Sequence, residues 1–307
     1  SMLRSRLLIR STNISRWISF QRYYSEQIID ADYVSGSEED AENVEQSLTI
    51  AERVKSLVHL RISGTLSSLA IRMKSSGDTE GDVDDVPPED SPPLWASVMP
   101  YIIHNSNPVF GVFPKERHSA NLLLHEKASL VVFSLTPSQY NPARLPIPRV
   151  NLSGIALPVE ESELQDIQQK FRKVHPKAAE YIEEYNYFSL QPKEIVCFTQ
   201  GNVEMISEKE YSEAHPDPVC TESRDVLTTF NEEKNINYLR LLCKEYADED
   251  VNEPILYHVD RYGFNVLAKT VGSNQYQEFR FPFPFEMKDI SEAAAAMNES
   301  ITEIKKK

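Results

Sequence analysis

Apolar residues recur at two spacings along the chain, and the change of spacing separates helical from extended segments. Ile50, Val54 and Leu57 share one face of a helix that cap-like residues predict to begin at Ser47. Further helices are predicted at 116–125 and 161–174. Apolar runs predict strands at 62–73, 94–103, 109–113, 129–135, 149–159, 187–191 and 195–199, with Pro192 as a break between the last two. So many strands with so few helices favour a barrel of mainly antiparallel strands.

The last part of the chain has a different pattern. One long helix is predicted at 224–246 and a final helix from Asp289. Between them lie short predicted strands at 255–260, 264–270 and 278–281. We therefore expect a barrel domain at 47–211, a linker at 212–222 and a smaller α+β domain at 223–307.

Residues 1–24 have the composition of an organelle presequence. They contain five arginines, no acidic residue and apolar residues at roughly helical spacing. The segment before Ser25 resembles a mitochondrial processing site, so we expect cleavage after Tyr24 and a mature protein in the mitochondrial matrix. A plastid transit peptide or a plain basic tail are the alternatives. Residues 25–46 are predicted to be a disordered acidic lead-in, and 74–93 an exposed acidic loop.

Composition narrows the range of partners. The 307 residues contain 32 Lys and Arg against 47 Asp and Glu, a net charge of −15, which disfavours binding to nucleic acid or anionic lipid. No apolar run is long enough to predict a membrane span. Cys197, Cys220 and Cys243 are too few and too far apart for a disulfide framework or a CxxC metal site. The sequence also lacks the phosphate-binding glycine loops, HExxH and a nucleophile elbow.

Several local motifs, in order, resemble a known family. In the predicted barrel these are WASVMPY (95–101), FPKERHSANL (113–122), ASLVV (128–132), RVNLSG (149–154) and KVHPKAA (173–179). In the last part of the chain they are FNEE (230–233), DRYGF (260–264) and FRFPF (279–283). Together they are similar to the HugZ-like haem-utilisation branch of the pyridoxamine phosphate oxidase superfamily, including its C-terminal haem-utilisation-associated domain. The resemblance implies an α+β fold, an FMN-binding-like split β-barrel followed by a smaller α+β domain, and a homodimer with FMN or haem at the subunit interface.

The candidate cofactor site lies where a predicted strand leads into the short helix at 116–125. Free backbone N–H groups and the positive end of the helix dipole favour an anion there. The resemblance implies that the superfamily holds its flavin phosphate at the matching positions. We expect four residues to hold a phosphate or propionate together with Ser97: Lys115, Arg117, Ser119 and Asn121. His118 is expected to face the ring of the ligand, and an ordinary helix-surface or capping histidine is the alternative.

Two departures from the family pattern count against enzyme chemistry. Thr229 and Lys234 stand where the family segment has histidines, so neither supplies a usual haem ligand. The acidic insertion at 74–93 replaces a short connection and is long enough to cover a pocket or dock a partner. Two functions therefore stay open. One is haem or FMN binding at a dimer interface, with a haem-handling or oxidoreductase role. The other is a non-catalytic adaptor or regulatory binding protein that has lost the cofactor.

Overall fold

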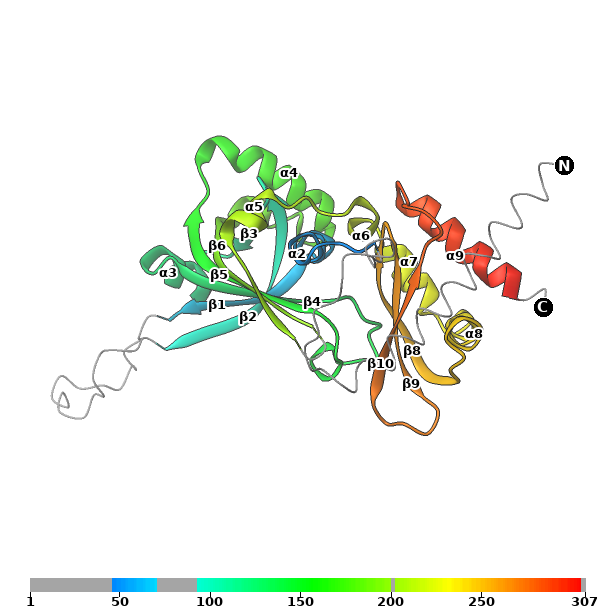
Figure 1. Cartoon of the computed structure of the whole chain (residues 1–307). Helices are drawn as coiled ribbons and strands as arrows, with labels where there is room; N and C mark the ends of the chain where they lie inside the picture. Colours follow the sequence, from blue (N-terminus) through cyan, green and yellow to red (C-terminus); the bar gives the residue numbers. More distant parts are fainter. Residues whose placement is uncertain (1–45, 71–92, 200–201, 305–307) are drawn as a thin grey trace, which may run out of the picture. The chain divides into compact units, whose positions relative to one another are not determined.

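The computed structural model describes residues 46–70, 93–199 and 202–304 (Figure 1). The expected presequence lies outside these residues, as do the acidic lead-in except for its last residue and the acidic loop except for Pro93. The described chain forms two compact units. The barrel unit contains Thr49–Ser134 and Pro142–Asp217, and the C-terminal unit contains Leu135–Asn141 and the residues from Pro218 onward.

The barrel unit is a closed antiparallel barrel of six strands with one further strand. Its strands are β1 (Ser63–Leu69), β2 (Leu94–His104), β3 (Asn107–Val112), β4 (Lys127–Phe133), β5 (Arg149–Pro158), β6 (Asn186–Phe198) and β7 (Val203–Ile206). They are ordered β3-β2-β1-β4-β5-β6-β7, and a pairing between β3 and β6 closes the barrel. The predicted fold class, a split barrel of mainly antiparallel strands followed by a smaller α+β part, is confirmed. The added strand β7 was not predicted.

Four α-helices accompany the barrel strands. They are α2 (Ile50–Leu60), α3 (Arg117–Leu124), α4 (Leu164–Val174) and α5 (Glu208–Glu213). Helix α2 is capped by Thr49, not Ser47, because Thr49 and Glu52 form a reciprocal capping box. The Tyr101 hydroxyl donates to the Val58 carbonyl at 2.8 Å and ties α2 to β2. Lys55, buried in α2, donates to the Tyr211 carbonyl of α5 at 3.0 Å.

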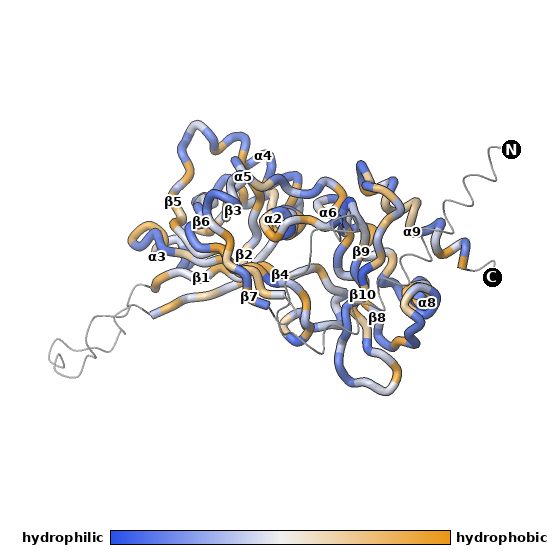
Figure 2. The backbone as a smooth tube through the Cα atoms, in the orientation of Figure 1, coloured by the Kyte–Doolittle hydropathy of each residue, from blue (hydrophilic) through white to orange (hydrophobic). Residues whose placement is uncertain are grey.

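Alternation along the strands produces two hydrophobic clusters. One fills the barrel and includes Leu66, Leu130 and Leu152, all fully buried. The other lies on the outer side under α4 and includes Ile102 and Phe171. Figure 2 shows the resulting alternation of hydrophobic and hydrophilic stretches along the strands. Because side chains point alternately inward and outward, one strand such as β2 supplies residues to both clusters.

The predicted break at Pro192 is wrong, since β6 runs without interruption through it. The pairing of β6 with β5 shifts register between Ser153 and Gly154, and Gly154 then lies opposite Pro192. A register shift leaves a gap in the ladder of hydrogen bonds, so the missing N–H of proline is tolerated there. A Cβ atom on Gly154 would lie 2.0 Å from the Gln191 carbonyl oxygen. The close approach of the two backbones therefore requires glycine.

The C-terminal unit packs helices with a three-stranded antiparallel sheet ordered β10-β9-β8. Its elements are α6 (Pro218–Thr221), α7 (Arg224–Phe230), α8 (Ile236–Ala247), β8 (Val251–Asp260), β9 (Gly263–Thr270), β10 (Tyr276–Pro282) and α9 (Ile290–Ile304). The long helix predicted at 224–246 is two helices. Asn231 ends α7, and its side chain bonds both the N–H and the carbonyl of Leu256 in β8. This contact with the sheet fixes the break.

Replacing Gly154 with alanine is expected to destabilise the barrel by about 2–3 kcal/mol, because the new methyl group overlaps the β6 backbone. Urea unfolding measures the change. Ser153→Ala is the neighbouring control and should cost less than about 1 kcal/mol, the loss of one half-buried hydrogen bond to Ser129. Equal stability of Gly154→Ala and wild type would contradict the assigned backbone contact.

Candidate functional site

The candidate cofactor residues lie where β2 and α3 meet. Ser97 is in β2 and has the same inward alternation as Met99 and Tyr101. Helix α3 begins at Arg117 and contacts β1, the neighbour of β2 (Figure 1). Lys115 precedes the helix and is exposed. The structure therefore brings the predicted residues to one end of the barrel.

His118 joins two strands by hydrogen bonds from within the barrel. Its side chain is buried, with Nδ1 2.8 Å from the Ser68 hydroxyl of β1 and Nε2 2.8 Å from the Ser97 hydroxyl of β2. Asn121, one helical turn further along α3, is also buried and donates to the Ser68 hydroxyl at 3.0 Å. The result is a continuous network from Asn121 through Ser68 and His118 to Ser97.

The proton positions in this network follow only in part from the groups themselves. The amide nitrogen of Asn121 can only donate, so Ser68 accepts from it. Ser68 and Ser97 each share one further hydrogen bond with a ring nitrogen of His118, and which group donates in each bond depends on the imidazole tautomer. Burial lowers the pKa of His118 and favours the neutral imidazole.

The remaining small polar residue of the predicted site is also turned inward. Ser119 is buried, and its hydroxyl accepts from the Asn186 side chain of β6 at 2.8 Å. The structure thus places His118, Ser119 and Asn121 in the interior, where we had expected them to meet a ligand at the surface. Their hydrogen bonds join α3 to β1, β2 and β6, and the expectation that these three residues hold the phosphate of FMN or a propionate of haem stays a prediction.

Lys115, Arg117 and Ser97 are the predicted site residues with access to solvent. The Arg117 guanidinium lies over the ring of Trp95, 4.7 Å from its centroid. Ser97 is half-buried, and its hydroxyl shares a hydrogen bond with His118 Nε2. These groups could contact an anion lying on the surface.

Ser68 and Asn186, the two polar partners that turn the predicted residues inward, were not predicted from the sequence. A signal for Ser68 was present, because it alternates with Leu66 in the predicted strand and so shares its inward face. Asn186 gave no comparable signal. It pairs across the barrel with Val112, a contact that depends on the closure of β3 onto β6.

A second polar cluster lies in the C-terminal unit. Cys220 Sγ is 3.9 Å from His258 Nδ1, His258 Nε2 is 3.0 Å from Asp260, and Arg280 donates to Asp260 at 2.8 Å. Burial would raise the pKa of Asp260, but the hydrogen bond with His258 and the charge of Arg280 outweigh it and hold the pKa below its usual range. The Cys220 thiol is only 1% exposed, which leaves a nucleophile no route to a substrate. The cluster ties α6 to two strands of the sheet.

Replacing His118 with alanine is expected to destabilise the barrel by about 2–4 kcal/mol, because the buried Ser68 and the half-buried Ser97 each lose a hydrogen bond. The folded pKa of His118 is lowered, so the unfolded chain takes up a proton first as the pH falls below about 6.5 and the stability of the wild type drops. The difference between wild type and variant should therefore shrink from pH 7.5 to pH 5. Chemical unfolding at both pH values measures it.

His125→Ala is the matched control for this experiment. His125 follows the same helix but is exposed, so its loss should change the free energy of unfolding by no more than about 0.5 kcal/mol. A His118 variant as stable as the control would contradict the network.

Comparisons with known proteins agree with the barrel. Residues 45–213 match the family model described as the CREG β-barrel. No curated protein matches the chain. No helix among the described residues is both long and apolar enough to cross a membrane.

The chain is similar to three solved structures to different degrees. A heme binding protein from Mycobacterium smegmatis is 21% identical, with a TM-score of 0.52 and coverage of 85% of this chain and 100% of that one. HutZ, a heme storage protein from Vibrio cholerae, is 15% identical, with a TM-score of 0.36 and coverage of 48% and 93%. A protein from Clostridium acetobutylicum assigned to the pyridoxinephosphate oxidase family is 9% identical, with a TM-score of 0.36 and coverage of 52% and 96%. The first of these shows a shared fold. Since the family model spans more than half of the 307 residues, the chain belongs to the CREG β-barrel family.

Proposed function

We propose that this chain is a non-catalytic binding protein whose barrel has lost its cofactor site and serves as a docking platform. The observation that carries the proposal is the network in which His118, Ser119 and Asn121 bond to the protein's own side chains. In this interpretation, groups that could hold a cofactor hold the barrel together. The adaptor role is the second of the two functions that the sequence leaves open.

The energy of this network supports the proposal. A ligand that recruited His118 would break its bonds to Ser68 and Ser97, and one that recruited Asn121 would break a buried bond to Ser68. Each buried polar group that loses its hydrogen bond in this way raises the free energy of the complex by about 1–3 kcal/mol. A ligand would have to recover that free energy before it gained any affinity. The interior arrangement therefore opposes binding at this end of the barrel.

The outer face of the sheet offers a surface for the docking role. Cross-strand pairing aligns one row of outward residues over six strands: Val98, Thr65, Val131, Asn151, Val196 and Met205. Val98 and Met205 at its two ends are each 72% exposed. We call this set the outer row. Its aliphatic side chains and its lack of charge suit a second copy of the chain, so we propose a homodimer through the outer row.

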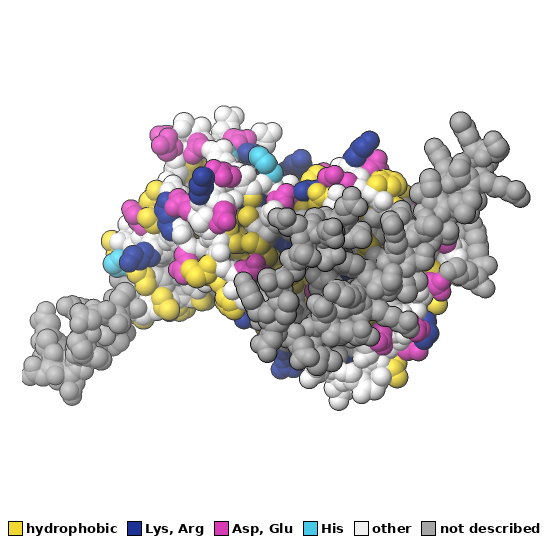
Figure 3. Space-filling model, in the orientation of Figure 1, with side chains coloured by type: hydrophobic (Ala, Val, Ile, Leu, Met, Phe, Trp, Pro, Cys, Tyr) yellow, Lys and Arg dark blue, Asp and Glu magenta, His cyan; other side chains and the backbone are white. Residues whose placement is uncertain are grey.

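Charge also favours a protein partner. On the face of the barrel unit seen in Figure 3, acidic and basic side chains are interspersed and no single basic patch stands out. With a net charge of −15 for the chain, this distribution suits a protein surface better than nucleic acid. The Arg-rich composition of residues 1–24 supports a proposed location in the mitochondrial matrix, with the plastid as the alternative.

Haem or FMN binding is the second candidate function. It is favoured by Ser97 on β2, Lys115 before α3 and Arg117 at the start of α3, which keep solvent access. The solved structure with the same fold from Mycobacterium smegmatis is named as a heme binding protein. In this alternative the ligand lies between two subunits and carries a haem-handling or oxidoreductase role. Membership of the HugZ-like branch, with its C-terminal domain, belongs to the same alternative.

Titration of the full-length protein with hemin and with FMN separates the two functions. The adaptor proposal predicts no saturable uptake of either compound, measured as a Soret band and as flavin fluorescence. Hemin adheres to many proteins without specificity, so the Lys115→Ala/Arg117→Ala double variant is the control. Stoichiometric uptake by the wild type that is lost in the double variant would favour the cofactor binder and reject the adaptor.

Light scattering after size-exclusion chromatography tests the proposed homodimer. We expect a dimer at tens of micromolar, and Val98→Asp should convert it to a monomer because a carboxylate would be buried in an apolar interface. Val271→Asp is the matched control, since Val271 is 64% exposed but lies in the C-terminal unit. A monomeric wild type would reject the homodimer, and a Val98→Asp dimer as stable as the control would place the interface elsewhere.

A further inference from the structure

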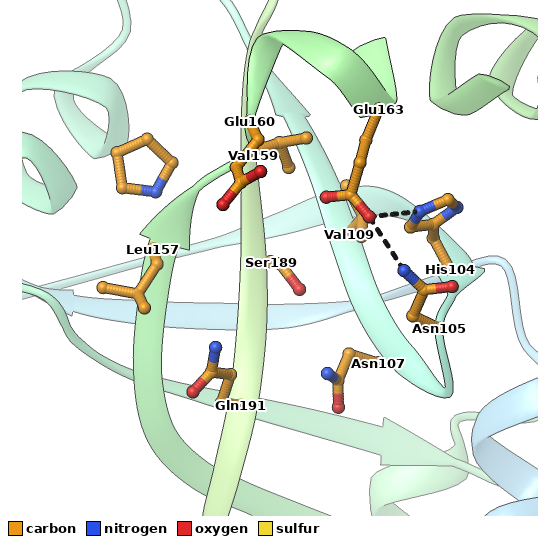
Figure 4. A pocket seen from close by; sticks show the side chains of 11 residues that line it. His104, Asn105, Asn107, Val109, Leu157, Val159, Glu160, Glu163, Ser189 and Gln191 are labelled. Carbon is orange, nitrogen blue, oxygen red and sulfur yellow. Dashed lines mark hydrogen bonds and ion pairs between the residues drawn. The ribbon is translucent and has the colours of Figure 1, made fainter. Parts of the chain in front are cut away.

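A cavity of about 240 Å³ lies on the outer face of the barrel, where the β2–β3 turn meets the segment between β5 and α4 (Figure 4). Eleven residues line it: His104, Asn105, Asn107, Val109, Leu157, Pro158, Val159, Glu160, Glu163, Ser189 and Gln191. Ser97 and His104 are seven residues apart in the extended strand β2, about 23 Å, and none of the predicted cofactor residues lines the cavity. The cavity is therefore a separate feature of the barrel unit.

Three neighbouring strands form the floor of the cavity. Ser189 in β6 pairs with Val109 of β3 on one side and with Leu157 of β5 on the other. Residues paired in this way point to the same face, so a hydroxyl lies between two aliphatic side chains. The floor can thus pack against a short hydrocarbon chain while offering one hydrogen-bonding group at its centre.

Two carboxylates form one wall. In Figure 4, Glu160 and Glu163 both extend into the space above Ser189. Glu163 is held in place because its Oε1 atom receives hydrogen bonds from His104 at 3.1 Å and from Asn105 at 2.8 Å. Among the described residues, the Glu163 Oε2 atom and the Glu160 carboxylate receive no hydrogen bond. Each retains the capacity to accept one from a ligand.

The opposite wall consists of two amide side chains, Asn107 and Gln191, which lie below Ser189 in Figure 4. Neither side chain hydrogen-bonds to another described residue, and each offers a carbonyl oxygen as an acceptor. No Lys or Arg is among the described residues that line the cavity. Lys170, the nearest cation on α4, is engaged by Asp166 at 2.8 Å and by His104 at 3.0 Å.

From these features we infer that the cavity binds a primary ammonium or guanidinium group carried on a short hydrocarbon chain. Such a group supplies several N–H donors and a positive charge for Glu160 and Glu163, and charge-assisted hydrogen bonds of this kind are the stronger ones. The aliphatic floor covers the hydrocarbon stem.

Other classes of ligand fit the cavity less well. An anion would be repelled by the two carboxylates. A divalent metal would find no group of three His, Cys, Asp or Glu ligands in the described residues. The volume lies below the roughly 300–1,000 Å³ typical of pockets for larger cofactors.

Isothermal titration calorimetry with putrescine and with methylguanidinium tests the inference. We expect saturable one-to-one binding of at least one probe, weakened at least about tenfold by Glu163→Gln and by Glu160→Gln. Tetramethylammonium has the charge but no N–H donor, so it should bind far more weakly. Glu161→Gln is the matched control: it removes one neighbouring exposed carboxylate that does not line the cavity, and it should leave binding unchanged.

The same measurements can overturn the inference. The inference is rejected if neither probe nor a peptide shows saturable binding. It is also rejected if Glu161→Gln weakens binding as much as Glu160→Gln and Glu163→Gln do, because affinity would then follow the net charge of the protein. Glu160→Gln provides an independent reading if Glu163→Gln disturbs the β2–β3 turn, which far-ultraviolet circular dichroism would report. A blocked tripeptide with a central arginine, compared with one with a central glutamine, distinguishes the sources. If the arginine peptide binds at least about tenfold more tightly than methylguanidinium and the glutamine peptide does not, the site is assigned to a side chain of a protein partner. If the arginine peptide and methylguanidinium bind equally, the site is assigned to a free amine.

Discussion

The pairing of β3 with β6 is the constraint on which the rest of the barrel depends. Strands β3 and β6 are far apart in sequence, and the four cross-strand pairs from Val109–Ser189 to Val112–Asn186 turn an open sheet into a closed one. Closure brings Asn186 to Ser119, which fastens α3 over one end of the barrel. The same pairing sets Val109 beside Ser189 and so forms the floor of the outer cavity. Both features of functional interest thus result from one long-range contact.

The α3 site shows how the same side chains can serve either a ligand or the fold. Histidine, serine and asparagine at a helix start are suited to bind an anion, and the sequence gives no reason to prefer one use over the other. Hydrogen-bond partners on other strands determine whether these side chains serve a ligand or the fold. Ser68 on β1 and Asn186 on β6 supply the hydrogen bonds that a ligand would otherwise supply. Once these bonds are formed in the interior, a ligand must compete with the protein itself.

Much of the fold could be predicted from the sequence because alternation and helical spacing are local signals. The strands at 94–103 and 149–159 are found within one residue of their predicted bounds. The helix predicted at 161–174 ends at Val174 as predicted but begins three residues late, at Leu164. The errors involve contacts between distant residues. Pro192 continues its strand because Gly154 permits a register shift opposite it, and the helix predicted at 224–246 breaks because Asn231 bonds to Leu256.

The residues of the candidate site lie at one end of the barrel, but the inward direction of their side chains was not predicted. The direction of a side chain on a short helix depends on which strand the helix covers, and that follows only from the closed barrel. The cavity gave no sequence signal at all, since its lining comes from the β2–β3 turn, the segment after β5 and the middle of β6.

Function in this chain is therefore best indicated by the polar groups that remain unsatisfied after folding. At the α3 end, the buried groups satisfy one another and leave Lys115, Arg117 and Ser97 on an open surface. At the outer cavity the reverse holds, because Glu160, Asn107, Ser189 and Gln191 line a hollow without bonding to other described side chains. Free acceptors in a hollow are a stronger indication of a ligand than the same residue types in a closed network, since a ligand can replace water on the former without breaking a bond within the protein. On that criterion the capacity of the barrel for polar recognition lies on its outer face rather than at the end of α3.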